Sequence, residues 1–171
     1  MTNEPNKLEK NDGPWYYEMC EVGYNYRITD FQCAMGSSQL KKLDRFVERR
    51  REIARFYDKA LSPVDFIKIP ESNSSVDHAY HLYPLQIDFA KTDVIKSDLF
   101  KKMKVFDINL QVHYIPVHLQ PFYQRNYGFK SGDFPITEQY YKEAISIPMF
   151  YGLKEDDQSY VISALREILG P

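Results

Sequence analysis

The chain has 171 residues, enough for one domain with a core of its own and too few for a complete two-domain enzyme. Its 22 basic and 24 acidic residues leave a net charge of −2, which disfavours broad binding to nucleic acid or to anionic membranes. No apolar run approaches the roughly 20 residues of a membrane helix, and the polar N-terminus is unlike a signal peptide, so we expect a cytoplasmic protein. Cys20 and Cys33 are expected to be small buried thiols in a reducing compartment.

The N-terminal part of the chain changes from polar to aromatic and then to helical patterning. Residues 1–13 are polar and contain an Asp-Gly pair, which predicts a flexible tail. Residues 14–61 are expected to form an aromatic segment followed by a long helix between domains. Thr29 and Gln32 match a capping box, so this helix is predicted to begin near Asp30.

Apolar residues at helical spacing continue to about Leu61, as one long helix or two. A kink is expected at residues 36–38, a Gly-Ser-Ser run of low helical propensity. The run Arg49–Arg51 could be a phosphate patch, but successive residues on a helix point in different directions, which favours a solvated or ion-paired face.

Residues 62–171 mix strands and helices without strict alternation, which predicts the α+β class, with a small antiparallel or mixed sheet packed on helices. Tyr83-Pro84 indicates an edge or a bulge, because proline lacks a ladder donor. A helix from Thr92 to Val105 is expected to turn Val94 and Ile95 inward. The other expected elements are strands at 65–70, 78–88, 110–114 and 145–147, a proline-rich aromatic loop at 116–135, and helices at 137–143 and 155–169.

A first candidate site precedes the helix start at Asp30. Asn25 and Arg27, with Tyr26 between them, are a neutral donor and a planar cation beside the positive end of a helix. This arrangement suits phosphate oxygens. From these residues alone, an ordinary turn with packing side chains is the favoured interpretation.

A second candidate site is the segment 113–123, which holds two of the four histidines among aromatic rings and prolines. His113, Tyr114 and His118 suit a nucleotide sugar, because rings stack on the base and sugar while imidazole and phenol groups bind hydroxyls and phosphates. Zinc is disfavoured, because no paired cysteine or carboxylate ligands lie at suitable spacing. Core rings with surface histidines remain an alternative, and His78 and His81 stay unassigned.

Seven segments of the chain match motifs of a known enzyme family: 12–19, 23–32, 34–36, 39–44, 48–53, 113–123 and 145–148. Together they resemble the DegT/DnrJ family of nucleotide-sugar aminotransferases, which are pyridoxal-phosphate enzymes of fold-type I. The resemblance extends over nearly the whole chain. Within the family it is greatest to enzymes that aminate the 4-keto group of UDP-4-keto-6-deoxy-N-acetylhexosamines, on the pseudaminic acid and spore coat polysaccharide routes.

The resemblance implies a role for each candidate residue and a fold equal to the C-terminal small domain of fold-type I aminotransferases. Asn25 would reach the cofactor phosphate of a partner subunit. Tyr26, Arg27, His113, Tyr114 and His118 would contact the UDP-sugar. The expected partners are a second copy in a homodimer or the large N-terminal domain, with glutamate as amino donor to the complete enzyme.

The family's cofactor lysine lies in a large domain N-terminal to the aromatic segment, and no lysine here has the matching motif. We therefore expect no covalently bound pyridoxal phosphate, no catalytic residue and no activity of this chain alone. Two alternatives remain, a non-catalytic module that binds nucleotide sugars and the structural remnant of a truncated gene. Dehydrases of the family replace the lysine with histidine, at a position outside this chain.

Overall fold

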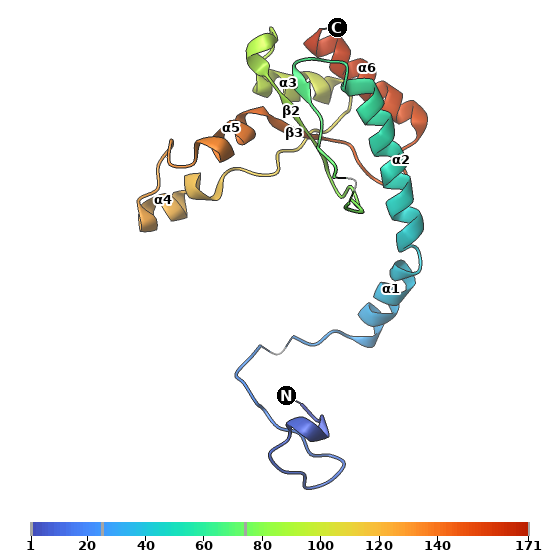
Figure 1. Cartoon of the computed structure of the whole chain (residues 1–171), viewed down its shortest axis with the longest axis vertical. Coiled ribbons are helices and arrows are strands. Elements are labelled where there is room, and N and C mark those ends of the chain that lie inside the picture. The colour runs from blue at the N-terminus through green and yellow to red at the C-terminus, as the bar shows by residue number, and fades with distance from the viewer. Residues whose placement is uncertain (1, 25, 74, 171) are drawn as a thin grey trace. The chain divides into compact units, whose positions relative to one another are not determined.

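The computed structural model describes residues 2–24, 26–73 and 75–170. The chain divides into two compact units, residues 1–41 and 42–171, which are described separately (Figure 1). None of the helices in the described part combines the length and the apolar character that a membrane span requires.

Residues 2–18 of the first unit form a closed loop around the carboxylate of Glu18. Two backbone hydrogen bonds join Thr2 and Glu18. A short 3-10 helix, η1 (Pro5–Lys7), follows Thr2 in the chain. The Glu18 carboxylate accepts the amides of Glu9 at 2.7 Å and Lys10 at 3.1 Å, and the phenol of Tyr16 at 2.8 Å. These donors, the Glu9 amide foremost, lower the pKa of Glu18, while burial and the bond to Glu18 raise the pKa of Tyr16 to about 12.

Helix α1 (Asp30–Leu40) begins as the sequence predicts. Thr29 caps it, since its hydroxyl accepts the Gln32 amide and the Gln32 side chain accepts the Thr29 amide. The helix is not interrupted at 36–38, where a kink or a close approach is predicted, since α1 runs through these residues and ends before Lys41. The alternative of a close approach is not found, because no atom lies within 4 Å of a Cβ built at Gly36. Glycine and serine each cost less than about 1 kcal/mol in a helix, which is too little to break this one.

The prediction of buried thiols is also wrong, because Cys20 and Cys33 are both exposed. Cys33 lies on α1, none of whose residues is buried. A thiol on this helix therefore has no apolar surroundings to enter.

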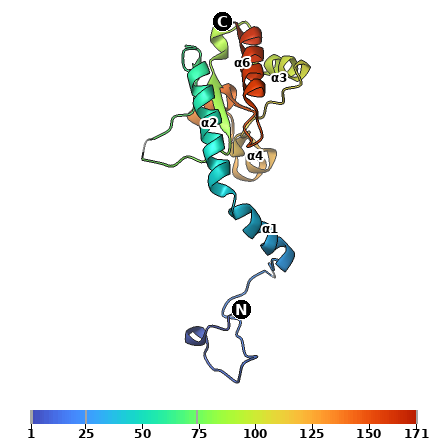
Figure 2. The same cartoon turned by 90° about the vertical axis from the view of Figure 1, so that its right-hand side faces the viewer.

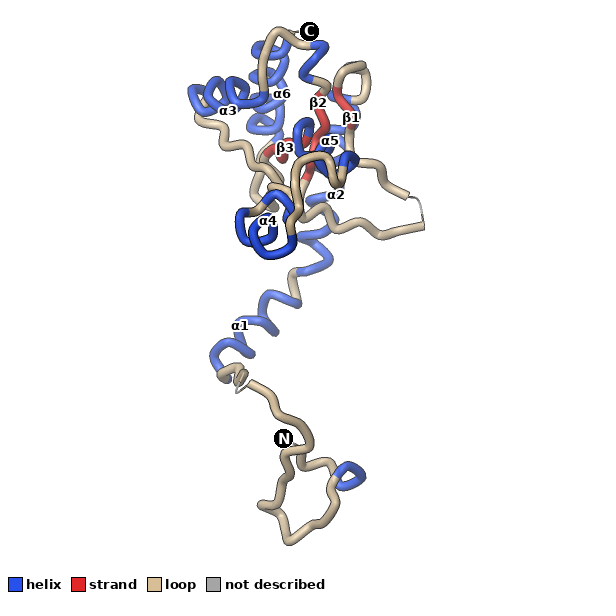
Figure 3. The backbone as a smooth tube through the Cα atoms, turned by 90° about the vertical axis from the view of Figure 1, so that its left-hand side faces the viewer, coloured by secondary structure: helices blue, strands red, loops and turns tan. Residues whose placement is uncertain are grey.

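The second unit is an α+β structure, as predicted, and its sheet is antiparallel. Figure 2 shows the helices of this unit. In the described part of the chain the sheet has three strands in the order β1-β2-β3, which are β1 (Ile67–Lys68), β2 (Tyr83–Ile87) and β3 (Ala144–Ile147). Helix α6 (Glu155–Leu169) packs against both α2 (Leu43–Leu61) and α3 (Lys96–Val105). The remaining elements are η2 (Phe89–Lys91), η3 (Val117–Leu119), α4 (Pro121–Tyr127) and α5 (Pro135–Glu143). Figure 3 distinguishes the helices, strands and loops by colour.

The core lies between the sheet and the helices. Tyr83, Leu85 and Ile87 alternate along β2 and are fully buried, as the period of a strand requires. Apolar residues at helical spacing complete the core from α2, α3 and α6: Ile53, Tyr57, Leu61, Leu99, Met103, Val161 and Leu165. Burial of these faces, rather than helix propensity, stabilises the unit.

Several predicted boundaries in this unit need correction. The strand predicted at 78–88 begins only at Tyr83, and the one at 65–70 shrinks to Ile67–Lys68. Residues 110–114 form no strand but a single bridge from Gln111 to Ser146, because only Gln111 finds a pairing partner.

Helix α3 starts later than expected, and Pro84 lies in the middle strand of the sheet. Helix α3 begins at Lys96, and Ile95 is its exposed N-cap rather than an inward residue. Thr92 forms a turn instead, with its hydroxyl accepting the Val94 amide. Pro84 lies in the middle strand, yet β1 pairs only with Gln86 and Ile87, so Pro84 has a partner strand on one side only.

Candidate functional site

The segment before α1 carries two of the predicted contact residues in the first unit. The rings of Tyr24 and Tyr26 stack with centroids 5.1 Å apart, and Tyr26 is 88% exposed. Arg27 is exposed as well. Asn25, the residue predicted to bind the cofactor, lies outside the described residues.

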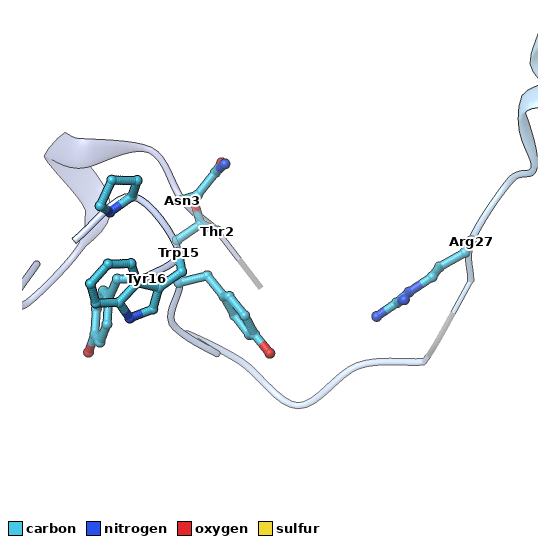
Figure 4. Close-up of a pocket in the computed structure, with 7 residues that line it drawn as sticks. Thr2, Asn3, Trp15, Tyr16 and Arg27 are labelled. Atoms are coloured by element: carbon cyan, nitrogen blue, oxygen red, sulfur yellow. The ribbon is translucent and has the colours of Figure 1, made fainter. Parts of the chain in front are cut away.

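Arg27 also lines an open hollow of ≈ 470 Å³ in the same unit. Its side chain points toward the side on which Trp15 and Tyr16 lie (Figure 4). Tyr17 and the polar residues Thr2 and Asn3 contribute further lining. A guanidinium opposite exposed rings and phenols can hold an anion attached to an aromatic or sugar group.

Trp15 and Tyr17 were not singled out as site residues from the sequence. The signal that could have found them is the Trp15-Tyr16-Tyr17 run itself, because three consecutive aromatic residues cannot all turn to one core. Trp15 is 74% and Tyr17 60% exposed.

In the second unit, His113 is fixed by β3. Its Nδ1 lies 2.8 Å from the buried hydroxyl of Ser146, and its ring meets Tyr114 edge to face with centroids 4.8 Å apart. Tyr114 is 74% exposed. The segment therefore presents a free phenol beside an imidazole whose Nδ1 is already occupied.

His118 is buried, unlike Tyr114, and its Nε2 lies 3.0 Å from Oε1 of Glu138. The Glu138 carboxylate accepts further hydrogen bonds from the hydroxyl of Ser131 and from the amides of Gly132 and Phe134. The bond from His118, followed by that from Gly132, lowers the pKa of Glu138 to about 2. An ionised carboxylate can only accept, so Nε2 of His118 carries the proton.

The predicted site residues thus fall into separate groups. Tyr26 and Arg27 belong to the first unit, and His113, Tyr114 and His118 to the second. Within the second unit, His113 and His118 are held by different partners. Sequence reasoning missed those partners, Ser146 and Glu138, although Glu138 follows the Phe134-Pro135 helix start at capping distance.

The arginine run on α2 binds backbone and acidic side chains. Nη1 of Arg50 donates to the carbonyl oxygens of Tyr80, His81 and Met149 at 2.9, 3.1 and 3.1 Å. Arg49 and Arg51 form the expected ion pairs, with Glu52 and with Glu48 and Asp77. The run therefore joins two loops to α2. The sequence predicted the ion pairs of this face but not the hydrogen bonds from Arg50 to backbone carbonyl groups.

Three lysines have environments that could suggest a reactive amine. Lys7 and Lys10, which line a hollow in the first unit, pair with Glu4 and Asp12. Burial lowers the pKa of Lys96, but its ammonium donates to the Tyr141 carbonyl. All three ammonium groups are therefore engaged by other groups of the chain. The described residues also contain no group of three or more metal-ligating side chains.

Comparison with known proteins gives these sites a context. The family model of the DegT/DnrJ/EryC1/StrS aminotransferases matches residues 5–166. The spore coat polysaccharide biosynthesis protein SpsC of Bacillus subtilis (strain 168) is 39% identical over 160 residues, 93% of this chain and 41% of that protein. A UDP-4-amino-4,6-dideoxy-N-acetyl-beta-L-altrosamine transaminase of Campylobacter jejuni is 35% identical over 155 residues, 91% of this chain and 40% of that protein.

A solved structure agrees on the fold. Helicobacter pylori PseC, an aminotransferase involved in the biosynthesis of pseudoaminic acid, superposes with a TM-score of 0.81 at 23% identity, over 95% of this chain and 42% of that one. The chain therefore spans about 40% of the length of the relatives it matches. Members of the family bind pyridoxal or pyridoxamine phosphate, and structures of one carry each form. With nearly its whole length matched, this chain belongs to the DegT/DnrJ/EryC1/StrS aminotransferase family.

Proposed function

We propose that this chain acts as the C-terminal part of a sugar-nucleotide aminotransferase in surface polysaccharide biosynthesis. The reaction transfers an amino group, with glutamate as donor, to the 4-keto group of a UDP-4-keto-6-deoxy-sugar. A large domain, joined to this chain or supplied as a second polypeptide, contributes pyridoxal phosphate and its lysine. Alone, the chain has no transaminase activity.

One structural observation carries this proposal. Helix α1 and the segment before it expose a row of large apolar side chains, and no residue of α1 is buried. A surface of this kind indicates a partner. The row consists of Trp15, Tyr17, Met19, Tyr24, Tyr26, Ile28, Phe31 and Met35.

The contacts proposed for the substrate follow from charge and exposure. Arg27, beside the rings of its hollow, binds the pyrophosphate. Tyr114 and His113 bind hydroxyl groups of the sugar. Asn25 reaches the cofactor phosphate of the partner subunit in a homodimer, and Tyr26 contacts the UDP-sugar. His118, predicted as a further contact, is buried and bonded to Glu138, so it supports this segment instead.

Complementation tests the proposal. The chain is mixed with the separately produced large domain of the Bacillus subtilis relative, pyridoxal phosphate, glutamate and a UDP-4-keto-6-deoxy-N-acetylhexosamine. We expect cofactor absorbance of an imine and transaminase activity beyond either polypeptide alone. Arg27→Ala should reduce this activity, whereas Arg55→Ala, which removes an exposed pair with Glu48, should not. No gain on mixing would contradict the proposal.

A second candidate, a non-catalytic module for nucleotide sugars, is favoured by the exposed Tyr114 beside His113. Calorimetry of the chain alone with UDP and UDP-N-acetylglucosamine separates the two. Binding without any gain of activity on complementation would support the module. If the chain shows neither binding nor activity, the alternative that is supported is the structural remnant of a truncated gene.

A further inference from the structure

Glu138 is a buried carboxylate that the predicted substrate contacts do not include. It lies in the first turn of α5, is 8% exposed, and uses both oxygens as acceptors. Its position at the N-terminal end of the helix favours the negative charge. A buried ionised group that is fully hydrogen-bonded fixes the groups around it, because moving any of them leaves the charge without a partner.

The donors to Glu138 come from both ends of one stretch of chain. His118 lies in η3, before α4, whereas Ser131 and Gly132 lie in the loop that follows α4. The carboxylate therefore closes residues 118–132 into a loop. Aromatic contacts accompany this closure. The ring centroid of Phe134 lies 4.7 Å from that of His118 and 5.7 Å from that of Phe129.

The segment that begins this stretch has a second anchor. His113 bonds the hydroxyl of Ser146 on β3, and His118 bonds Glu138, so the five-residue step between them is held at both ends. Between the anchors, Tyr114, Ile115 and Val117 are exposed. Because both ends are held, the exposed side chains between them are kept in one arrangement before any ligand arrives.

We propose that Glu138 is a positioning residue that, through His118, holds residues 113–118 in the conformation that receives a UDP-sugar. This inference rests on the proposed function for its ligand. Glu138 does not contact the sugar; it sets where Tyr114 and the ring of His113 stand. Loss of the carboxylate charge releases His118 and the loop amides together, and the exposed residues between the anchors lose their fixed place.

Two measurements on the full chain test the proposal, with Glu138→Gln as the main variant and Glu167→Gln, an exposed site on α6, as the matched control. Hydrogen exchange followed by mass spectrometry reports the anchoring. Calorimetry with UDP-N-acetylglucosamine reports the binding surface. Ser131→Ala, which removes one donor only, serves as a milder variant that folds even where Glu138→Gln does not.

We expect Glu138→Gln to raise amide exchange in residues 113–134 at least tenfold, to leave exchange in α2 and β2 unchanged, and to weaken UDP-N-acetylglucosamine binding at least tenfold. Ser131→Ala should give smaller changes in the same direction. Glu138→Asp, which keeps the charge on a shorter side chain, should restore part of the affinity. A purely structural residue would change exchange or thermal stability without changing affinity.

Unchanged exchange in residues 113–134 would overturn the anchoring, and faster exchange with unchanged affinity would overturn the positioning. Absence of binding by the wild-type chain would overturn the ligand assignment, whereas the proposed function stands or falls with complementation. In that case the exchange data still decide whether Glu138 holds the loop, so the two failures are distinguishable.

Discussion

The phenol of Tyr83 on β2 donates a hydrogen bond to Oδ1 of Asp58 on α2 and thereby joins the middle strand to the long helix. The Tyr83 ring is fully buried and lies 5.1 Å from that of Tyr57, whose own phenol donates to the Pro148 carbonyl. Burial, and after it the bond to Asp58, raises the pKa of Tyr83 well above its usual range. The core of the second unit therefore contains a phenol whose neutral form is strongly favoured by burial.

Replacement of Tyr83 by phenylalanine keeps the ring and removes this bond. We expect Tyr83→Phe to lower the free energy of unfolding by about 1–2 kcal/mol, since Asp58 loses a donor. Denaturant titration measures the change. A neutral result would show that water replaces the phenol at Asp58.

The raised pKa of Tyr83 also predicts an alkaline loss of stability. In the unfolded chain the phenol ionises near pH 10, whereas in the folded chain it stays protonated, so its contribution is complete below pH ~10 and falls as pH rises further. The pKa of Tyr57 is raised in the same sense, chiefly by burial. Unfolding free energy measured from pH 8 to 11 should fall less steeply in Tyr83→Phe than in the wild type, and equal slopes would contradict the assignment.

Arg50 is expected to be the most important of the three consecutive arginines for stability. Its Nη1 serves three carbonyl oxygens in two loops, and Arg50→Ala leaves all three without that donor. We expect a loss of about 2 kcal/mol of unfolding free energy and faster exchange of the amides that follow Tyr80. Arg50→Lys should lie between, and Arg55→Ala, which breaks only an exposed pair, should cost less than about 1 kcal/mol.

The elements that follow local rules were predictable from sequence. The capping box at Thr29 and Gln32 places the start of α1, and the last helix lies at 155–169 as expected. The boundaries of the short strands were not predictable, because a strand ends where its pairing with a neighbouring strand ends. Residues 110–114 alternate like a strand, yet only Gln111 finds a partner, at Ser146.

The candidate site was only partly predictable for the same reason. His113 and His118 are visible as residue types, but their hydrogen-bond partners lie 33 and 20 positions further along the chain. Ser146 looks like an ordinary strand residue until the sheet register places it beside Gln111 and His113. Similarly, the burial of His118 follows from Glu138 on another helix, which no local pattern connects to it.

Removal of the α1 cap should unwind the helix locally. Thr29→Ala deletes the hydroxyl that accepts the Gln32 amide, and such a loss costs about 1 kcal/mol of helix stability. Because no residue of α1 is buried, packing cannot compensate. We expect faster amide exchange across residues 30–33 and lower helical circular dichroism. The opposite result is expected for Ser38→Ala, which improves helix propensity without touching the cap.

Cys33 provides a direct probe of the surface that we assign to the large domain. Its thiol is exposed on α1, so a thiol reagent should modify it in the native chain at a rate close to that in denaturant. Addition of the large domain should slow this reaction at least tenfold, because α1 becomes covered. A Cys20→Ser background isolates the Cys33 signal. Equal rates with and without the large domain would show that α1 lies outside the contact, even if activity were restored.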